Sequence, residues 1–212
     1  DLSHELQSPL ARMAIAAKLT RTAENREAVA ARLQKEITRV SEMVAGLVDI
    51  TRAEGDPAAL RRDPVDFQET VADIVAGCEW EAGEKSVRIL PEIEPATIGG
   101  NEELLRRAVE NVLRNAIHYS PEGGKVEISL AVESGEAAVV VRDHGPGVPA
   151  DALERIFAPF YRVEQARERD GAGGMGLGLA LAQRAVLLHQ GTIRAENANP
   201  GLRVTIRLHT SQ

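Results

Sequence analysis

The sequence feature that most constrains this chain is a glycine-dense stretch that runs directly into an apolar helical pattern. Glycine fills five of the eight positions from 171 to 178, and residues 179–183 continue with leucine, alanine and one glutamine. Glycine lets a backbone approach a ligand closely, and the start of a helix offers unpaired N–H groups at a positive dipole end. The stretch suits a phosphate-binding loop, but taken alone the same pattern is as often a flexible connection.

Composition narrows the class of partner. Hydrophobic residues make up 43% of the 212 residues and aromatic residues only 3%, so we expect an ordinary core filled by aliphatic side chains. The net charge of −7 and the pI near 5.4 argue against nucleic acid or an anionic membrane as the main partner. Both of those partners need clustered lysine and arginine.

The single cysteine, Cys78, has no partner for an internal disulfide, and we expect it to be a small buried residue. No apolar run approaches the roughly 20 residues of a membrane span, and the first residues do not have the pattern of a signal peptide. The chain begins abruptly inside a helical pattern, so we interpret it as a fragment of a longer protein.

Two helical stripes open the chain. Apolar residues recur at helical spacing from Leu6 to Ala17 and again from Val29 to Leu47, with a short polar connection between them. Two such helices form a hairpin that covers only part of its apolar surface. We therefore predict a homodimer through residues 1–54 that closes a four-helix bundle.

The pattern changes at residues 55–63, where glycine, proline and charged residues indicate a linker. Beyond it we predict a domain over residues 64–212. Its expected helices cover residues 67–82 and 101–118 and the segment from the glycine loop to about 189, and its expected strands cover residues 87–90, 127–132, 137–142, 191–196 and 202–208. Helices and mostly antiparallel strands in segregated runs indicate an α/β two-layer sandwich.

Asn111 and Asn115 project from one face of the helix predicted over residues 101–118, because they stand four residues apart. An amide oxygen is a neutral hard ligand that suits Mg²⁺. The alternative is a pair of solvated polar residues on a helix surface. Tyr119 follows shortly after and either stacks on a base or fills the core.

Asp143 ends an apolar strand and is followed by Gly145 and Gly147. A carboxylate at this point can accept a hydrogen bond from an exocyclic amine, while the glycines let the main chain pass beside a flat ring. An aspartate that caps a turn at the end of a strand is the alternative interpretation.

Residues 157–162 form the densest aromatic cluster of the chain and end on Arg162, which could reach a terminal phosphate. Residues 163–170 are polar and lack apolar periodicity. We predict a mobile lid there, anchored at its aromatic end and hinged at its glycine end.

His4 stands beside Glu5 on the first helix, just off the apolar stripe, and Pro9 follows five residues later. Proline inside a helix should loosen it near the histidine. A neutral exposed imidazole can attack phosphorus, and an adjacent carboxylate can orient it. An ordinary surface histidine is the alternative.

Five motifs, in this order, resemble those of the catalytic core of bacterial sensor histidine kinases. They are the phosphoacceptor box at residues 3–10, the asparagine box at 111–116, the first glycine box at 143–147, the phenylalanine box at 157–162 and the second glycine box at 174–179. The amino-acid sequence of residues 155–162, together with Glu110 and Asn111, resembles that of envelope-stress sensor kinases of the Cpx type.

The resemblance implies a dimeric phosphotransfer hairpin followed by an ATP-binding domain of the type shared with gyrase and Hsp90. His4 would take the γ-phosphoryl group of ATP and pass it to an aspartate of a response regulator, with Glu5 as its acid/base or orienting partner. The residues implied to bind Mg²⁺·ATP are Asn111 and Asn115 for metal and phosphate, Asp143, Gly145 and Gly147 for adenine, and His118, Tyr119, Arg162, Gly174, Gly176, Leu177 and Gly178 around the nucleotide.

The chain departs from the pattern of this family at three positions. Gln7 stands where Arg or Lys is usual, Ser8 replaces the usual Thr that supports regulator phosphatase activity, and His118 replaces a usual Lys or Arg. A neutral imidazole contacts phosphate less strongly than a lysine at pH 7, so we expect weaker ATP binding.

Two other functions stay open from the sequence. One is a degenerate kinase that acts as a nucleotide-binding dimeric scaffold or phosphatase. The other is a different ATPase of the same fold, although Asn111 stands where such hydrolases are expected to have a water-activating glutamate. The resemblance also implies that the chain is the cytoplasmic portion of an inner-membrane sensor, joined to the membrane only through upstream segments.

Overall fold

The computed structural model describes residues 29–30, 34, 37, 63–163 and 176–211. The chain divides into two units, residues 1–52 and 53–212, and the account below concerns the second. The dimeric four-helix bundle expected for residues 1–54 lies outside the described residues, apart from four helical positions between 29 and 37. It therefore stays a prediction, as does the linker at residues 55–63.

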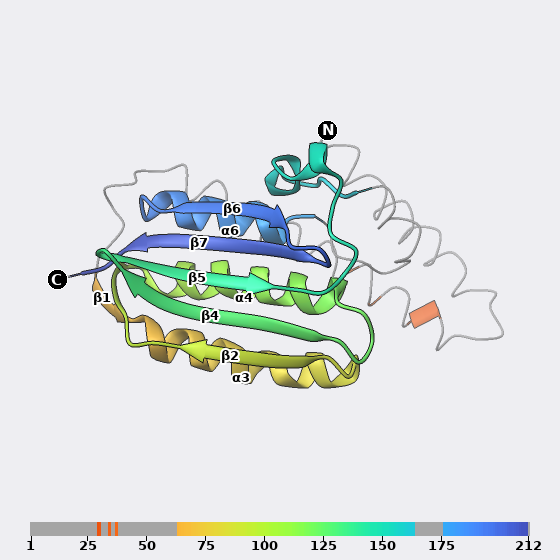
Figure 1. Cartoon of the computed structure of the whole chain (residues 1–212), viewed down its shortest axis with the longest axis horizontal. Helices are drawn as coiled ribbons and strands as arrows, with labels where there is room; N and C mark the ends of the chain where they lie inside the picture. Colours follow the sequence, from red (N-terminus) through yellow and green to blue (C-terminus); the bar gives the residue numbers. More distant parts are fainter. Residues whose placement is uncertain (1–28, 31–33, 35–36, 38–62, 164–175, 212) are drawn as a thin grey trace. The chain divides into compact units, whose positions relative to one another are not determined.

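The second unit is built from one layer of helices and one layer of strands (Figure 1). The helices are α3 (Phe67–Glu84), α4 (Glu102–Tyr119) and α6 (Gly178–Leu188). The sheet has the order β2-β4-β5-β7-β6 and consists of β2 (Arg88–Ile93), β4 (Lys125–Glu133), β5 (Glu136–Arg142), β6 (Thr192–Asn197) and β7 (Leu202–His209). The predicted α/β two-layer sandwich is confirmed.

The sheet is antiparallel except at one edge. β4 and β5 form the predicted hairpin, with Glu133 opposite Glu136, and β7 pairs with β5 on one side and β6 on the other. The exception is β2, which pairs parallel with β4. Every second residue is buried along β5 and along β4 as far as Leu130, as expected for a sheet whose one face is covered, and the last three residues of β4 are exposed.

A second, two-stranded sheet was not predicted. It pairs β1 (Asp63–Asp66) antiparallel with β3 (Thr97–Gly100), and β1 begins at Asp63, which the sequence pattern places at the end of the linker. Each strand has only four residues, and proline in one and two glycines in the other resemble turn signals. Such short strands leave too little alternation to be recognised from sequence. Two short 3₁₀ turns, η2 (Ala150–Ala152) and η3 (Arg155–Phe157), were likewise not predicted.

Side chains fix where the two long helices begin. Asp66 caps α3 by accepting from the Glu69 N–H over 3.0 Å, and Asn101 caps α4 by accepting from the Leu104 N–H over 3.1 Å. Asn101, predicted as helical, is therefore the residue that starts α4 rather than part of it. These caps satisfy N–H groups that have no partner within the helix.

The end of α4 is held by a lysine from the end of α3. The Lys85 ammonium donates to the carbonyl oxygen of Ile117 over 3.3 Å and to that of His118. A cation at this position also suits the negative dipole end of the helix. Lys85 therefore fixes the last turn of α4, which ends at Tyr119.

A histidine joins α6 to the start of α4. The Asn101 N–H donates to His189 Nε2 over 3.0 Å, and His189 Nδ1 lies 2.7 Å from the Ala185 carbonyl oxygen. Because Nε2 accepts, Nδ1 carries the proton and donates to Ala185. Gly100 leaves room for this ring, since a Cβ at residue 100 would collide with it.

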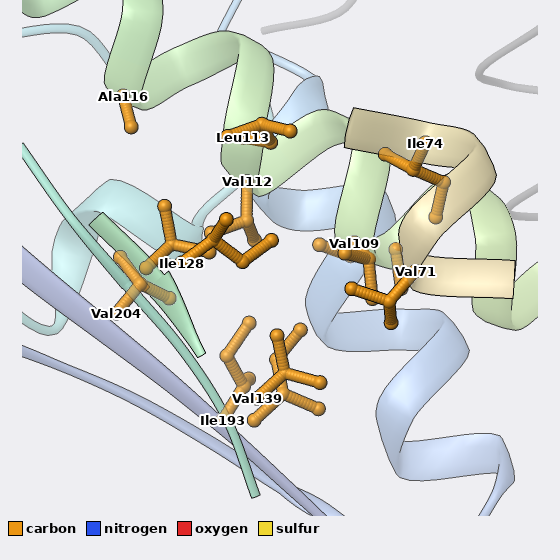
Figure 2. Close-up of a cluster of buried hydrophobic side chains, with 14 of the residues drawn as sticks. Val71, Ile74, Val109, Val112, Leu113, Ala116, Ile128, Val139, Ile193 and Val204 are labelled. Atoms are coloured by element: carbon orange, nitrogen blue, oxygen red, sulfur yellow. The ribbon is translucent and has the colours of Figure 1, made fainter. Parts of the chain in front are cut away.

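The core between the two layers is aliphatic, as predicted (Figure 2). The helices contribute side chains such as Val71 and Leu113, and the strands contribute others such as Ile128 and Val204. Cys78 is buried in this core, as expected. Trp80 is not part of it: the side chain lies on the outer face of α3 and is 74% exposed.

Candidate functional site

Most of the predicted site residues lie among the described residues, and some do not. His4, Glu5, Ser8 and Gly174 lie outside them, as does nearly all of the predicted lid at residues 163–170. The described ones come from α4, from the segment that follows β5, and from the segment that leads into α6. The contacts below join these three segments.

Asp143 follows the last residue of β5 and is only 4% exposed. Its Oδ1 accepts from the N–H groups of Gly145 over 2.8 Å and Leu202 over 3.2 Å. In the part of the chain that the structure describes, no hydrogen bond ends on Oδ2. Burial raises the pKa of the Asp143 carboxyl, although the hydrogen bonds from Gly145 and Leu202 act in the opposite direction.

Asp143 thus has the features of a recognition carboxyl. It is buried and held in one orientation by two backbone donors, and one oxygen remains to accept from a ligand. Burying such a group without a partner for every lone pair is costly, so a ligand that donates to Oδ2 would be favoured.

The segment after β5 lies against the end of α4. A Cβ on Gly145 would collide with the carbonyl oxygen of Tyr119, so only glycine fits there. Gly147 has a φ of 69°, in the left-handed region that favours glycine. The predicted first glycine box therefore contacts the helix that carries the predicted asparagine box.

The start of α6 lies against the middle of α4. A Cβ on Gly178, the first residue of α6, would stand 3.3 Å from Asn111 Oδ1. Leu177, just before it, is buried at 4% exposure. The structure therefore brings the second glycine box and Asn111 together.

The aromatic cluster is joined to the same segment. The Phe160 N–H donates to the Gly176 carbonyl oxygen over 2.9 Å, and a Cβ on Gly176 would stand 2.7 Å from the Tyr161 carbonyl oxygen. The Arg155 guanidinium lies over the Tyr161 ring, 4.5 Å from its centroid, a cation–π contact that was not predicted. Arg162 follows this cluster and is half-buried.

The other predicted residues of α4 are half-buried. Asn115 stands one turn after Asn111, and the His118 and Tyr119 rings meet edge to face at 4.8 Å between centroids. Asn111 lies beside Gly178 at the start of α6, and Tyr119 lies beside Gly145 in the segment after β5. The glycine segments predicted to bind the phosphates and the adenine thus both lie against α4.

Two contributors were missed from the sequence: Gly201, in the turn between β6 and β7, and Leu202, the first residue of β7. Leu202 exchanges two hydrogen bonds with Asp143, one from the Asp143 N–H to the Leu202 carbonyl over 3.0 Å. Gly201, with a φ of 94°, lies so close to Asp143 that a Cβ would collide with the Asp143 carbonyl. A glycine in a turn can indicate close packing, but the sequence around Gly201 does not identify Asp143, 58 residues earlier, as the residue packed against it.

Comparison with known proteins agrees with this arrangement. Residues 100–212 match the family model described as histidine kinase-, DNA gyrase B-, and HSP90-like ATPase. The chain belongs to this family, and its second unit is an ATP-binding domain of the histidine kinase type.

The curated relatives are sensor histidine kinases, a narrower class than the family model. The chain is 34% identical over 211 residues to the sensor histidine kinase CpxA of Escherichia coli strain K12, covering 98% of this chain and 45% of the relative. It is 33% identical over 199 residues to the sensor-like histidine kinase SenX3 of Mycolicibacterium smegmatis, covering 92% and 52%. The chain spans about half the length of these relatives. The predicted resemblance to sensor histidine kinases, including those of the Cpx type, is confirmed.

Solved structures agree. A mycobacterial sensor histidine kinase, MprB, matches with 31% identity and a TM-score of 0.62 over 70% of this chain and 97% of its own. The histidine kinase AdeS of Acinetobacter baumannii has a TM-score of 0.81 at 21% identity over 99% of this chain and 98% of its own, which shows the fold alone. In the part of the chain that the structure describes, no helix has both the length and the apolar character of a membrane span.

Proposed function

We propose that this chain is the catalytic core of a sensor histidine kinase, which phosphorylates itself on His4 from ATP and passes the phosphoryl group to an aspartate of a response regulator. The observation that carries the proposal is the buried Asp143 carboxyl. Two backbone N–H groups fix its orientation, and the neighbouring Gly145 is packed so closely that a larger residue would not fit. The 34% identity to CpxA supports the same activity. One solved homologous fold is the histidine kinase ThkA in complex with the response regulator protein TrrA.

On this proposal Asp143 receives the exocyclic amine of adenine on Oδ2, while Gly145 and Gly147 let the main chain pass beside the ring. The phosphates are lined by the second glycine box, at Gly174, Gly176, Leu177 and Gly178. The rest of the nucleotide is surrounded by His118, Tyr119 and Arg162. These roles follow the motifs of the family, and the contact between Asn111 and Gly178 supports them by joining the two motifs.

On this proposal Asn111 and Asn115 supply amide oxygens on one face of α4, and Asn111 lies beside the start of α6. Neutral oxygen ligands of this kind fit Mg²⁺, which takes most of its remaining ligands from water and phosphate. When bound, Mg²⁺ would neutralise charge that develops on the transferred phosphoryl group. Within the proposal, the two asparagines orient the phosphates rather than take part in bond making.

The transfer itself needs His4 to reach the γ-phosphate, which we propose occurs when the ATP-binding domain moves on the linker at residues 55–63. A nitrogen of His4 forms a bond to phosphorus, the bond from phosphorus to the bridging oxygen breaks, and ADP leaves. Glu5 accepts or orients the imidazole proton, and Ser8 supports dephosphorylation of the regulator. Catalysis is then mainly a matter of positioning.

Two further parts of the proposal concern the whole protein. Residues 1–54 would form the homodimer, and segments upstream of this chain would anchor it to the inner membrane with this part on the cytoplasmic side. Analytical ultracentrifugation of the 212-residue chain tests the dimer: sedimentation as a monomer at micromolar concentration would contradict it.

The phosphorylation assay is the main test. The whole chain is incubated with Mg²⁺ and γ-labelled ATP beside His4→Gln and, as a matched control, His209→Gln, which changes an exposed histidine on β7. We expect acid-labile, alkali-stable label on the wild type and on His209→Gln and none on His4→Gln. Label that persists on His4→Gln overturns the acceptor, and nucleotide binding without any label supports a scaffold or phosphatase instead.

A second assay tests the metal role. Asn115→Ala should weaken binding of Mg²⁺·ATP at least tenfold while leaving the affinity for adenosine, which has no phosphates, within twofold of the wild type. Unchanged Mg²⁺·ATP affinity would contradict the assignment of Asn115.

A further inference from the structure

Asn197, the last residue of β6, holds the main chain of Val148 with both ends of its amide. Nδ2 donates to the Val148 carbonyl oxygen over 2.7 Å, and Oδ1 accepts from the Val148 N–H over 3.0 Å. The side chain thus pairs with Val148 as a neighbouring β-strand would, although the two residues lie 49 positions apart.

Val148 ends the segment that begins at Asp143, and Leu202, the first residue after the turn that follows Asn197, holds the other end of that segment. The turn is closed by a hydrogen bond from the Ala198 N–H to the Gly201 carbonyl over 2.8 Å. The two residues that flank this turn, Asn197 and Leu202, therefore clamp residues 143–148 at both ends.

The clamp also sets the path of the segment between its ends. Among the residues that the structure describes, no other hydrogen bond holds Pro146, Gly147 or Val148. A Cβ on Gly147 would stand only 2.6 Å from Asn197 Oδ1, so the main chain passes directly over the amide. The Val148 side chain also packs against the core, and Gly145 is held by Asp143 and Tyr119, so the amide matters most for the main chain of Pro146 and Gly147 between those points.

Asn197 is exposed, as is its contact with Val148. Exposed hydrogen bonds contribute modestly to the free energy of folding, because water can replace them. What water cannot replace is the defined position of the Gly147 main chain relative to the Asp143 carboxyl. The contribution of Asn197 should therefore appear in ligand binding more than in stability.

We propose that Asn197 is a positioning residue of the adenine side of the nucleotide site, acting through Val148 and Gly147 rather than by touching the nucleotide. This inference depends on the proposed nucleotide-binding function of Asp143. Losing the amide lets the segment relax away from the position that fits adenine, so binding weakens and adenine loses its advantage over guanine.

The test measures binding of ADP and of GDP to the whole chain by calorimetry, together with thermal unfolding without nucleotide. The variants are Asn197→Ala and Asn197→Leu, which keeps the branch at Cγ and the number of heavy atoms but removes the amide, and the control is Glu196→Ala, which changes the exposed neighbour. We expect both Asn197 variants to raise the Kd for ADP about tenfold and to reduce the preference for ADP over GDP severalfold, with unfolding temperatures within a few degrees of the wild type. Glu196→Ala should bind ADP like the wild type.

The outcomes distinguish a failure of the positioning role of Asn197 from a failure of the proposed nucleotide-binding function. If the wild type binds neither nucleotide, the proposed function fails. If the wild type prefers ADP and the Asn197 variants bind both nucleotides as it does, the positioning role is overturned. A loss of affinity equal for ADP and GDP that accompanies a large drop in unfolding temperature would also overturn it, since that pattern marks a purely structural role.

Discussion

The carbonyl oxygen of Tyr119 lies against the α-carbon of Gly145, closely enough that a methyl group on Gly145 would collide with it. Tyr119 is the last residue of α4, and Gly145 follows β5, so this contact joins the helix that carries the asparagines to the segment that carries Asp143. The methyl group would be fixed to the α-carbon of residue 145, and the oxygen belongs to the main chain of Tyr119, so neither can rotate away as the end of a flexible side chain can.

Gly145→Ala should therefore move the segment after β5 and weaken nucleotide binding at least tenfold, with a loss of about 1–3 kcal/mol in the free energy of unfolding. Titration with ADP and urea unfolding measure the two effects. Wild-type affinity in this variant would mean that the segment is not part of the site.

Gly77→Ala is the matched control and a prediction in its own right. Gly77 lies within α3, and a Cβ there would meet nothing within 4 Å. Because alanine loses less backbone entropy in a helix than glycine does, we expect a gain of about 0.5–1 kcal/mol in the free energy of unfolding and unchanged ADP affinity. A loss of stability on urea unfolding would show that this face of α3 is not open.

Asp143→Asn tests the electrostatics of the buried carboxyl. Because burial raises the pKa of Asp143, the folded state holds the proton more tightly than the unfolded chain. The free energy of unfolding of the wild type minus that of Asp143→Asn should then be highest in acid and fall as pH rises through about 4 and above. Urea unfolding of both proteins from pH 3.5 to 7 measures the difference, and a difference that rises with pH would contradict the direction of the pKa.

Much of the fold could be predicted from sequence because its longer elements carry clear periodicity. Alternating apolar residues indicate β4, a continuous run of three valines indicates β5, and the apolar stripe around Leu105 indicates α4. The two-residue turn between Glu133 and Glu136 is a local signal, so the hairpin was also predictable. The parallel pairing of β2 with β4 was not, because no local pattern specifies a partner across an intervening helix.

The same distinction applies to the site. Motifs identified Asn111, Asp143 and the glycines one by one, and the structure adds which of them touch. The support of Asp143 by Leu202 joins residues 59 positions apart and leaves no trace in either local sequence. The roles of His4, Glu5 and Ser8 remain predictions, since these residues lie outside the described part of the chain.

Lys85→Met should loosen the end of α4. Methionine keeps most of the buried stem but removes the ammonium that donates to the Ile117 and His118 carbonyls. We expect a loss of about 1–2 kcal/mol in the free energy of unfolding, because these carbonyls have no partner within the helix. Lys125→Met, which breaks a partly exposed ion pair with Glu127, should cost less than about 1 kcal/mol. Equal losses in the two variants would argue against the capping role.

Cys78 should react slowly with thiol reagents in the folded protein. Burial raises the pKa of its thiol, against the lowering effect of the nearby Arg114, and only the thiolate reacts. The rate of reaction with a disulfide reagent at pH 8 should be at least a hundredfold lower in buffer than in urea. The assay is unambiguous because the chain has one cysteine, and equal rates would show that residue 78 is accessible.

β3 lies between the two ends of the domain: its neighbour on one side comes from the beginning of the domain, and its neighbour on the other side comes from the end. β1, where the described part of the domain begins, pairs with β3, and Thr210 and Ser211 at the other end bond to Ile98 and Thr97 of the same strand. The two ends therefore lie close together with only β3 between them, which is the geometry that tolerates circular permutation and insertion into a longer chain. A force applied to either end would be borne first by β3, which leads through Asn101 directly into α4, the helix of Asn111 and Asn115.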